Sequence, residues 1–178
     1  MAQSQPDAGQ QSDSSWLIVE DRFDTGSEAV SESLYSLSNG YLGVRGSFAE
    51  GLSFSSGHRG HYAATVFNDH VAPGPPPSKG CPAAPRELVN LPDFTCLRIF
   101  VDGNPIDLNA CEIIEHQRVL DMRRGLLYRR SVLRAPDGLE IALRGERFVT
   151  RLRPPITAFP LAITSLKRTA TLSVESGI

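Results

Sequence analysis

The segment from Glu32 to Gly51 holds the densest set of residues that could do chemistry. Glycines recur at every third position, 40, 43 and 46, and Arg45 stands between the last two. Asn39-Gly40 is a strong signal for a tight turn, because both residues tolerate a positive φ. The glycines beside Arg45 let the backbone approach a neighbour closely, and the guanidinium offers a fork for an anion. We predict a hairpin here, in which Arg45 contacts either Glu50 or a ligand.

Pairs of acids elsewhere have the composition of an acid–base pair but not its context. Asp21 with Asp24, and Glu112 with Glu115, lie three residues apart. On a loop or at a strand end, such acids are more typical of solvated caps and turns. The glycines of the 32–51 segment do not form G-x-G-x-x-G, and no G-K-[ST] occurs in the chain, so nucleotide binding is not indicated.

Histidines and serines also lack the partners that metal binding or nucleophilic catalysis requires. His58-x-x-His61, followed by His70, offers no further ligand at a suitable spacing, and we expect these histidines in an exposed polar loop. The serines between positions 33 and 38 are not part of a G-x-S-x-G elbow. The residues alone therefore predict no catalytic residue and no metal site.

Composition excludes several classes of protein. The chain has 178 residues with a formal net charge of −2 and 40% hydrophobic residues, which suits one globular domain. No apolar run approaches the roughly 20 residues of a membrane span. The stretch from His116 to Arg153 carries ten arginines against four acids. We interpret it as solvated arginines on outward strand faces rather than a nucleic-acid surface. An odd number of cysteines, three, and no visible secretory signal favour a reducing, cytoplasmic location.

The elements that must position these residues are mostly strands. Positions 1–14 are a polar segment predicted to be a disordered tail, and the proline-rich stretch 72–86 is predicted to be an exposed loop inserted in the domain. Short strands separated by turn signals predict an all-β fold, an antiparallel sandwich whose last strand leaves an open edge, so that the sandwich is incomplete at its C-terminal end. The expected elements are strands at 97–101, 126–134, 139–144, 156–166 and 170–174, turns at 102–103 and 136–138, and a short helix at 27–37.

Motifs along the chain resemble the N-terminal domain of glycoside hydrolase family 65, which includes inverting phosphorylases of maltose, trehalose and kojibiose and some hydrolases. The matching residues are the run from Glu32 to Gly51, Trp16 with Glu20 and Phe23-Asp24, Glu87 to Asp93, Val101 to Gly103, Arg118 to Met122, Gly125, Glu146 to Val149, and the final Glu175 to Ile178. Gly60 to Thr65 departs from the family's pattern. The resemblance implies that 15–178 form a supersandwich-like β-sandwich, which in the family packs against an (α/α)6 barrel.

The resemblance further implies that catalysis belongs to the barrel, which is absent from this sequence. There an acid and inorganic phosphate, the co-substrate, act on an α-linked disaccharide with inversion, and no other cofactor is implied. No catalytic residue carries over to this chain. Tyr41, Arg45 and Glu50 are the candidates for a loop at the pocket mouth. The expected partners are the disaccharide, phosphate, the barrel and a second copy in a homodimer. The alternatives are a free-standing carbohydrate-binding module and an interaction protein that uses the proline-rich loop.

Overall fold

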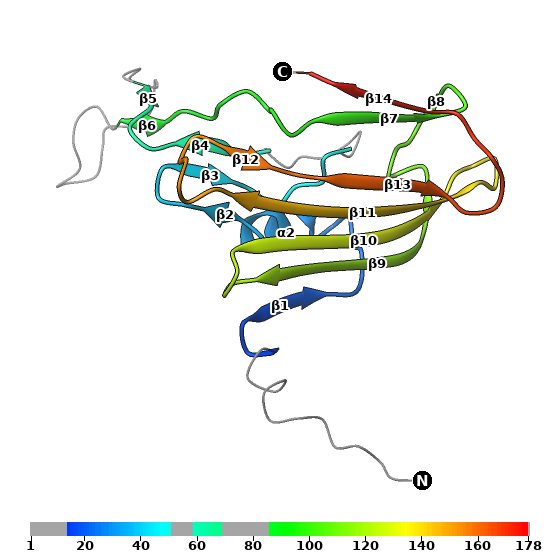
Figure 1. Cartoon of the computed structure of the whole chain (residues 1–178), viewed down its shortest axis with the longest axis horizontal. Coiled ribbons are helices and arrows are strands. Elements are labelled where there is room, and N and C mark those ends of the chain that lie inside the picture. The colour runs from blue at the N-terminus through cyan, green and yellow to red at the C-terminus, as the bar shows by residue number, and fades with distance from the viewer. Residues whose placement is uncertain (1–13, 51–58, 69–85, 178) are drawn as a thin grey trace, which may run out of the picture.

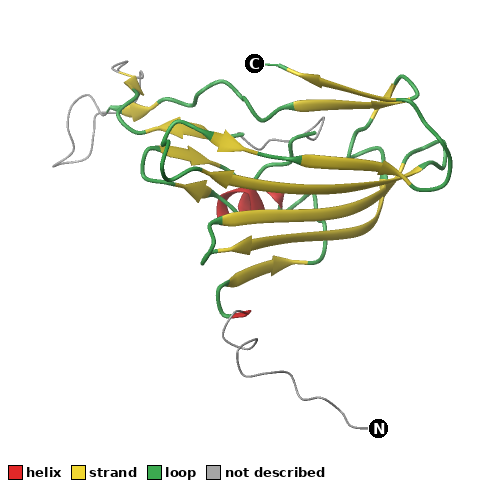
Figure 2. Cartoon of the chain, in the orientation of Figure 1, coloured by secondary structure: helices red, strands yellow, loops and turns green. Residues whose placement is uncertain are grey.

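A computed structural model of the chain describes residues 14–50, 59–68 and 86–177. Strands dominate these residues, and α2 (Glu28–Leu34) is the main helix (Figures 1 and 2). The predicted tail lies outside the described residues except for Ser14, and so does the proline-rich loop except for Arg86. No helix in the described ranges is long and apolar enough to cross a membrane.

A six-stranded antiparallel sheet forms one layer of the fold (Figure 1). The order runs β1-β9-β10-β11, after which β11 pairs with both β12 and β13 along different parts of its length. Its strands are β1 (Leu17–Glu20), β9 (Glu112–Asp121), β10 (Leu126–Arg134), β11 (Glu140–Val149), β12 (Thr157–Ala158) and β13 (Leu161–Ser165).

Smaller elements face one side of this large sheet. They are a three-stranded sheet of β14 (Leu172–Ser176), β7 (Leu97–Val101) and β8 (Asn104–Pro105), a three-stranded sheet of β2 (Leu37–Ser38), β3 (Leu42–Val44) and β4 (His61–Ala63), and α2. A two-stranded ladder joins β5 (Phe67–Asn68) to β6 (Glu87–Leu88). These sheets confirm the predicted all-β, antiparallel sandwich-like class.

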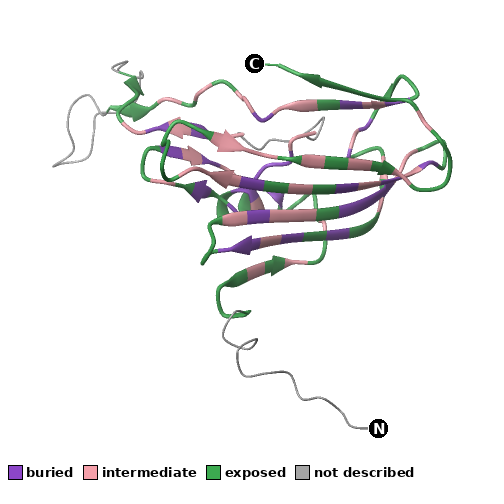
Figure 3. Cartoon of the chain, viewed as in Figure 1, coloured by how far each residue is buried: buried purple, intermediate pink, exposed green. Residues whose placement is uncertain are grey.

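Alternation along the strands builds the core between the layers. Leu139, Ile141 and Leu143 are 3%, 0% and 1% exposed, as the two-residue period of the sequence predicts. They pack with Ile99 and Val101 of β7, which joins the two layers. A second cluster contains Tyr35 and Leu37, next to α2, with Leu120 and Leu127 of the large sheet. Figure 3 shows the resulting stripes of buried residues along β9, β10 and β11.

Most of the predicted elements are present, but several bounds differ. The helix predicted at 27–37 is shorter, Glu28–Leu34, and is followed by β2, and the last predicted strand, 170–174, is Leu172–Ser176. The predicted strand at 156–166 is two strands, because Pro160 has no N–H for the ladder and lies between β12 and β13. The arginines of the 116–153 stretch are not all on outward faces: Arg118 and Arg147 are 1% and 6% exposed. Strand β9 contains a bulge, because Val132 pairs with Glu115 whereas the next residue, Leu133, pairs with Ile113. The extra residue shifts the alternation of β9 by one position, so that the side chains facing the core are Ile113 and then His116.

Strand β14 lies at an edge of the smaller layer. β14 pairs with β7 on one side, and no strand in the described part of the chain pairs with its other side. All five residues of β14 are exposed, as its colour in Figure 3 shows. The prediction of an open edge at this strand is therefore confirmed for the described residues.

Candidate functional site: a buried charge cluster beneath the Asn-Gly hairpin

The helix α2 turns an acidic face toward the large sheet. Glu28 and Glu32, one turn apart, are only 4% and 2% exposed. Carboxylates are almost never buried to this extent unless they are paired. Their partners come from strand β9 and from the segment that follows the hairpin β2–β3. The charged side chains of these two glutamates therefore point into the protein.

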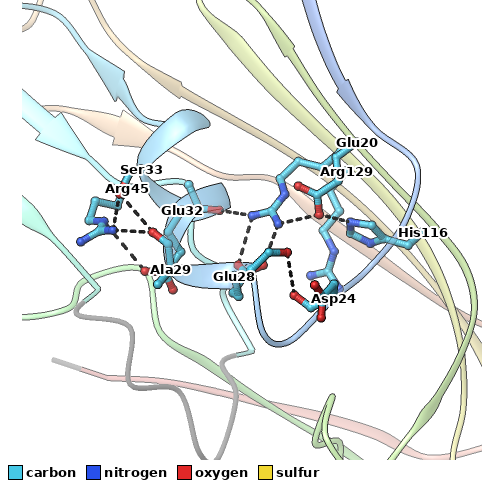
Figure 4. Close-up of polar contacts among 12 residues, drawn as sticks. Glu20, Asp24, Glu28, Ala29, Glu32, Ser33, Arg45, His116 and Arg129 are labelled. Carbon is cyan, nitrogen blue, oxygen red and sulfur yellow. Dashed lines mark hydrogen bonds and ion pairs between the residues drawn. The ribbon is translucent and has the colours of Figure 1, made fainter.

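Arg118 is the centre of these contacts. Its Nη1 and Nη2 donate to Glu28 Oε1 and Oε2 at 3.1 and 2.7 Å, a bidentate pair. Nη2 also donates to Glu20 Oε1 at 3.0 Å, and His116 Nε2 lies 3.4 Å from the same oxygen. We call Glu20, Glu28, His116 and Arg118 the Arg118 cluster; Figure 4 shows Glu20 beside His116, with Glu28 nearby.

Further contacts tie the Arg118 cluster to the 32–51 segment. Arg118 Nη1 donates to the carbonyl oxygen of Gly46 at 3.0 Å. The guanidinium carbon lies 4.4 Å from the ring centroid of Phe48 and 4.9 Å from that of Tyr35. A Cβ on Gly46 would come within 2.6 Å of Tyr35 Cβ, so only glycine allows this approach. One arginine thus joins β1, α2, β9 and the segment after the hairpin.

Ionisation in the Arg118 cluster follows from burial and pairing. Burial opposes the charge on Glu20, but hydrogen bonds from His116 and Arg118 outweigh it and lower its pKa to about 2. Burial raises the pKa of Glu28 above its usual value, and repulsion by Glu20 and Glu32 adds to this, against the bonds from Arg118. The pKa of Arg118 is raised, because its two carboxylates overcome the opposing effect of burial. The Arg118 guanidinium therefore favours the charged form of Glu20 and counteracts the effect of burial on Glu28.

Arg45 is directed at α2 and not at Glu50. Its Nη2 donates to the carbonyl oxygen of Ala29 at 3.0 Å and to Ser33 Oγ, as Figure 4 shows, and its Nε lies 3.8 Å from Glu32 Oε2. The backbone carbonyl of Arg45 accepts a hydrogen bond from Arg147 Nη1 at 2.8 Å. The expected contact between Arg45 and Glu50 is wrong, because the helix offers Arg45 nearer oxygen partners.

The side chain of Glu50 is fully buried and pairs with Arg129 of β10. The guanidinium carbon of Arg129 in turn lies 4.1 Å from the ring centroid of Phe48. These residues line a small cavity of about 50 Å³, which is too small for a sugar. Glu50 therefore holds its end of the segment to the large sheet.

Tyr41 is the exposed member of the three predicted loop residues. It is 43% exposed and lies at the tip of the hairpin. Asn39 shapes this tip: its Oδ1 accepts from the backbone N–H of Tyr41 and Leu42 at 2.9 and 2.7 Å, and its Nδ2 donates to the carbonyl oxygens of Thr150 and Pro154. Gly40 has a φ of +88°, as the predicted turn requires.

A groove of about 450 Å³ opens beside Tyr41. Its other lining residues are mostly apolar and include Leu42, Leu91, Phe94, Ile156 and Phe159. The structure therefore does not bring Tyr41, Arg45 and Glu50 into one pocket: Tyr41 borders a surface groove and the other two point inward. Their role at a pocket mouth stays a prediction.

Of the three histidines considered as metal ligands, His61 lies within the described residues. His58 and His70 lie outside the described residues. His61 is not in an exposed loop as expected: it is fully buried on β4, where its Nε2 lies 3.2 Å from Thr95 Oγ1 and 3.5 Å from Asp93 Oδ1. Burial lowers the pKa of His61. Nowhere in the described ranges do three His, Cys, Asp or Glu side chains gather as a metal ion would need.

Asp24, Glu112 and Glu115, three of the four acids considered, each have a partner of their own. Asp24 accepts a hydrogen bond from the Gly26 N–H at 2.9 Å, a turn role as expected. Glu112 pairs with Arg134, and Glu115 lies 3.2 Å from Arg130, both at exposed positions.

The residues that organise this region were largely missed by reasoning from the sequence. Glu20 and Arg118 lie within the motifs, but no role followed from their types. The available signal was the two-residue period of β9, in which His116, Arg118 and Leu120 share a face. A buried arginine on that face requires carboxylate partners.

Comparisons with known proteins give a consistent match. Residues 18–178 match the sequence profile described as the glycosyl hydrolase family 65, N-terminal domain. A kojibiose phosphorylase of Caldanaerobacter subterraneus subsp. tengcongensis is 35% identical over 165 residues, which are 92% of this chain and 20% of that protein. An alpha,alpha-trehalose phosphorylase of Thermoanaerobacter brockii is 27% identical, over 92% of this chain and 21% of that protein.

Comparison with solved structures gives the same family of enzymes. A structure titled as a putative kojibiose phosphorylase from human microbiome superposes with a TM-score of 0.72 at 26% identity, over 84% of this chain and 20% of that one. The chain thus spans about a fifth of the length of the proteins it resembles.

Proposed function

The chain belongs to glycosyl hydrolase family 65, as its N-terminal domain, and from this premise we propose that it is the non-catalytic domain of an inverting α-glucoside phosphorylase or hydrolase. Its substrates would be disaccharides such as maltose, trehalose or kojibiose. Inorganic phosphate would attack the anomeric carbon, while an acid of a separate barrel domain protonates the leaving oxygen. The observation that carries this proposal is the family match over 18–178.

A supporting role for the domain is consistent with its contacts. Arg118, Arg45 and Glu50 contact neighbouring residues of the sandwich and hold the hairpin segment in place. The mostly apolar groove beside Tyr41 supports docking to the barrel, with Tyr41 at the edge of the substrate pocket. Arg45 and Glu50 would act as positioning residues, since they fix the segment that presents the hairpin. A homodimer and a reducing, cytoplasmic location belong to the same proposal; Cys96 and Cys111 are free thiols.

Activity of the chain alone tests the non-catalytic role. The 178-residue chain is incubated with maltose, trehalose or kojibiose and inorganic phosphate, and glucose 1-phosphate is measured. The Caldanaerobacter kojibiose phosphorylase serves as the positive control. We expect no product above the enzyme-free background, and turnover by the chain alone would contradict the proposal.

A chimera tests the supporting role. The corresponding segment of the Caldanaerobacter phosphorylase is replaced by residues 18–178 of this chain. We expect phosphorolysis of kojibiose to be retained, and Tyr41→Ala to raise KM more than Phe67→Ala, an exposed aromatic residue on β5 that serves as the matched control. A folded chimera without activity would remove the support for this role, and equal effects of the two variants would remove Tyr41 from the pocket.

A further inference from the structure

The face of the large sheet turned away from α2 carries a groove of about 500 Å³ over β9, β10, β11 and β13. Strand register places seven of its lining residues in two rows. One row is Gln117, Arg130, Arg144 and Ala162, each opposite the next on the neighbouring strand. The adjacent row is Val119, Tyr128 and Glu146. Since neighbouring strands are about 4.8 Å apart, the first row is about 14 Å long.

The polar side chains of these rows are largely unused within the protein. Within the part of the chain that the structure describes, the side chains of Gln117, Tyr128, Arg144 and Glu146 have no hydrogen bond or ion pair. Only Arg130 is paired, with Glu115 at 3.2 Å, and both of these side chains are more than half exposed. The groove therefore offers free donors and acceptors on rigid strands.

Two features of the charges indicate the kind of ligand. Arg130 and Arg144 are directly opposite each other, an arrangement of like charges that destabilises a sheet. Glu115 and Glu146 on the same face bring the net charge to zero, so the face does not attract anions over a distance. A neutral molecule with many hydroxyl groups can accept from the arginines, donate to Glu146, and place a ring face on Tyr128.

We propose that this groove is a binding site for a neutral oligosaccharide. Tyr128 stacks on a sugar ring, Arg144 and Gln117 bind hydroxyl oxygens, and Glu146 accepts hydroxyl protons. This site is built entirely from residues of this chain. It lies apart from the groove beside Tyr41, with which it shares no lining residue.

Calorimetric titration of the full chain with four neutral trisaccharides tests the site: maltotriose, cellotriose, mannotriose and chitotriose. We expect at least one to bind with a millimolar dissociation constant. Tyr128→Ala and Arg144→Thr should each weaken that binding roughly tenfold, the loss expected for a hydrogen bond to a charged group or an equivalent contact. Phe67→Ala and Arg98→Ala are matched controls, since both residues are exposed and lie on other sheets. Both controls should bind as the unaltered chain does.

Inorganic phosphate, titrated alone, is the anionic probe. The proposal is overturned if none of the trisaccharides binds, if binding survives both groove variants, or if phosphate binds and displaces the sugar. Both groove variants change outward side chains, and their circular dichroism and unfolding midpoints check that they fold. Because this titration reads binding without phosphorolysis, it can succeed or fail independently of the chimera.

Discussion

Replacing Arg118 by Met should lower the free energy of unfolding by about 3–5 kcal/mol at pH 7, the loss typical when one member of a buried ion pair is removed. Arg118 makes three hydrogen bonds to Glu20 and Glu28 and one to the Gly46 carbonyl, and it is 1% exposed. Met keeps much of the volume against Tyr35 but leaves two carboxylates without a cation. Such a loss is a large part of the stability of a typical domain.

Two controls separate charge from packing in this variant. At pH 4 the loss should shrink, because the carboxylates of Glu20 and Glu28, without Arg118, take up protons and no longer bury a charge. A triple variant, Arg118→Met, Glu28→Leu and Glu20→Met, should recover most of the stability, since well-packed apolar replacements of a buried ion pair are often neutral or stabilising.

Urea unfolding followed by circular dichroism, at pH 7 and pH 4, measures these differences. A loss below about 1 kcal/mol at pH 7 would refute the view that Arg118 holds the region together. An equal loss at both pH values would show that packing against Tyr35 and Phe48, rather than charge, is what Arg118 provides. A triple variant as unstable as the single one would lead to the same conclusion.

Three further predictions concern the same region. Gly46→Ala should destabilise the chain by several kcal/mol in thermal unfolding, because the new Cβ would lie 2.7 Å from the Tyr35 carbonyl oxygen. The control, Gly177→Ala, should have little effect, because no atom lies near the position of its Cβ. Asn39→Ala should lower the free energy of unfolding by about 2 kcal/mol, since four hydrogen bonds of the hairpin depend on that side chain; a change within error would contradict this. Glu20, with its pKa lowered from 4.5 to about 2, contributes stability that is full above pH 4.5 and lost as pH falls toward 2, so the difference between the unaltered chain and Glu20→Gln should narrow over that range.

The strands could be predicted because their signals are local. β10 has the predicted bounds, and the inward residues Ile141 and Leu143 follow from a period of two along a few neighbouring residues. The turn at Asp102-Gly103 was equally readable, and both residues have a positive φ. Each of these signals depends on residue types within a single element.

The inner charges could not be predicted, because their partners are far along the chain. Arg118 has the residue type of an exposed position, and its burial is explained by Glu28 and Glu20, which lie 90 and 98 residues earlier. His61 is similar, since its neighbours Asp93 and Thr95 belong to a distant segment. Reasoning from composition assigns such side chains to solvent, as it did for the arginines of the 116–153 stretch.

The distance between partners has a consequence for synthesis on the ribosome. Helix α2 and the hairpin are held by Arg118 and Thr150, which are 90 and 111 residues beyond Glu28 and Asn39. At roughly 5–20 residues per second, this delay amounts to about 5–20 s. Until β9 and β10 emerge, the apolar side chains of Tyr35 and Leu37 have no layer to cover them. Exposed apolar side chains of this kind are what chaperones bind on nascent chains.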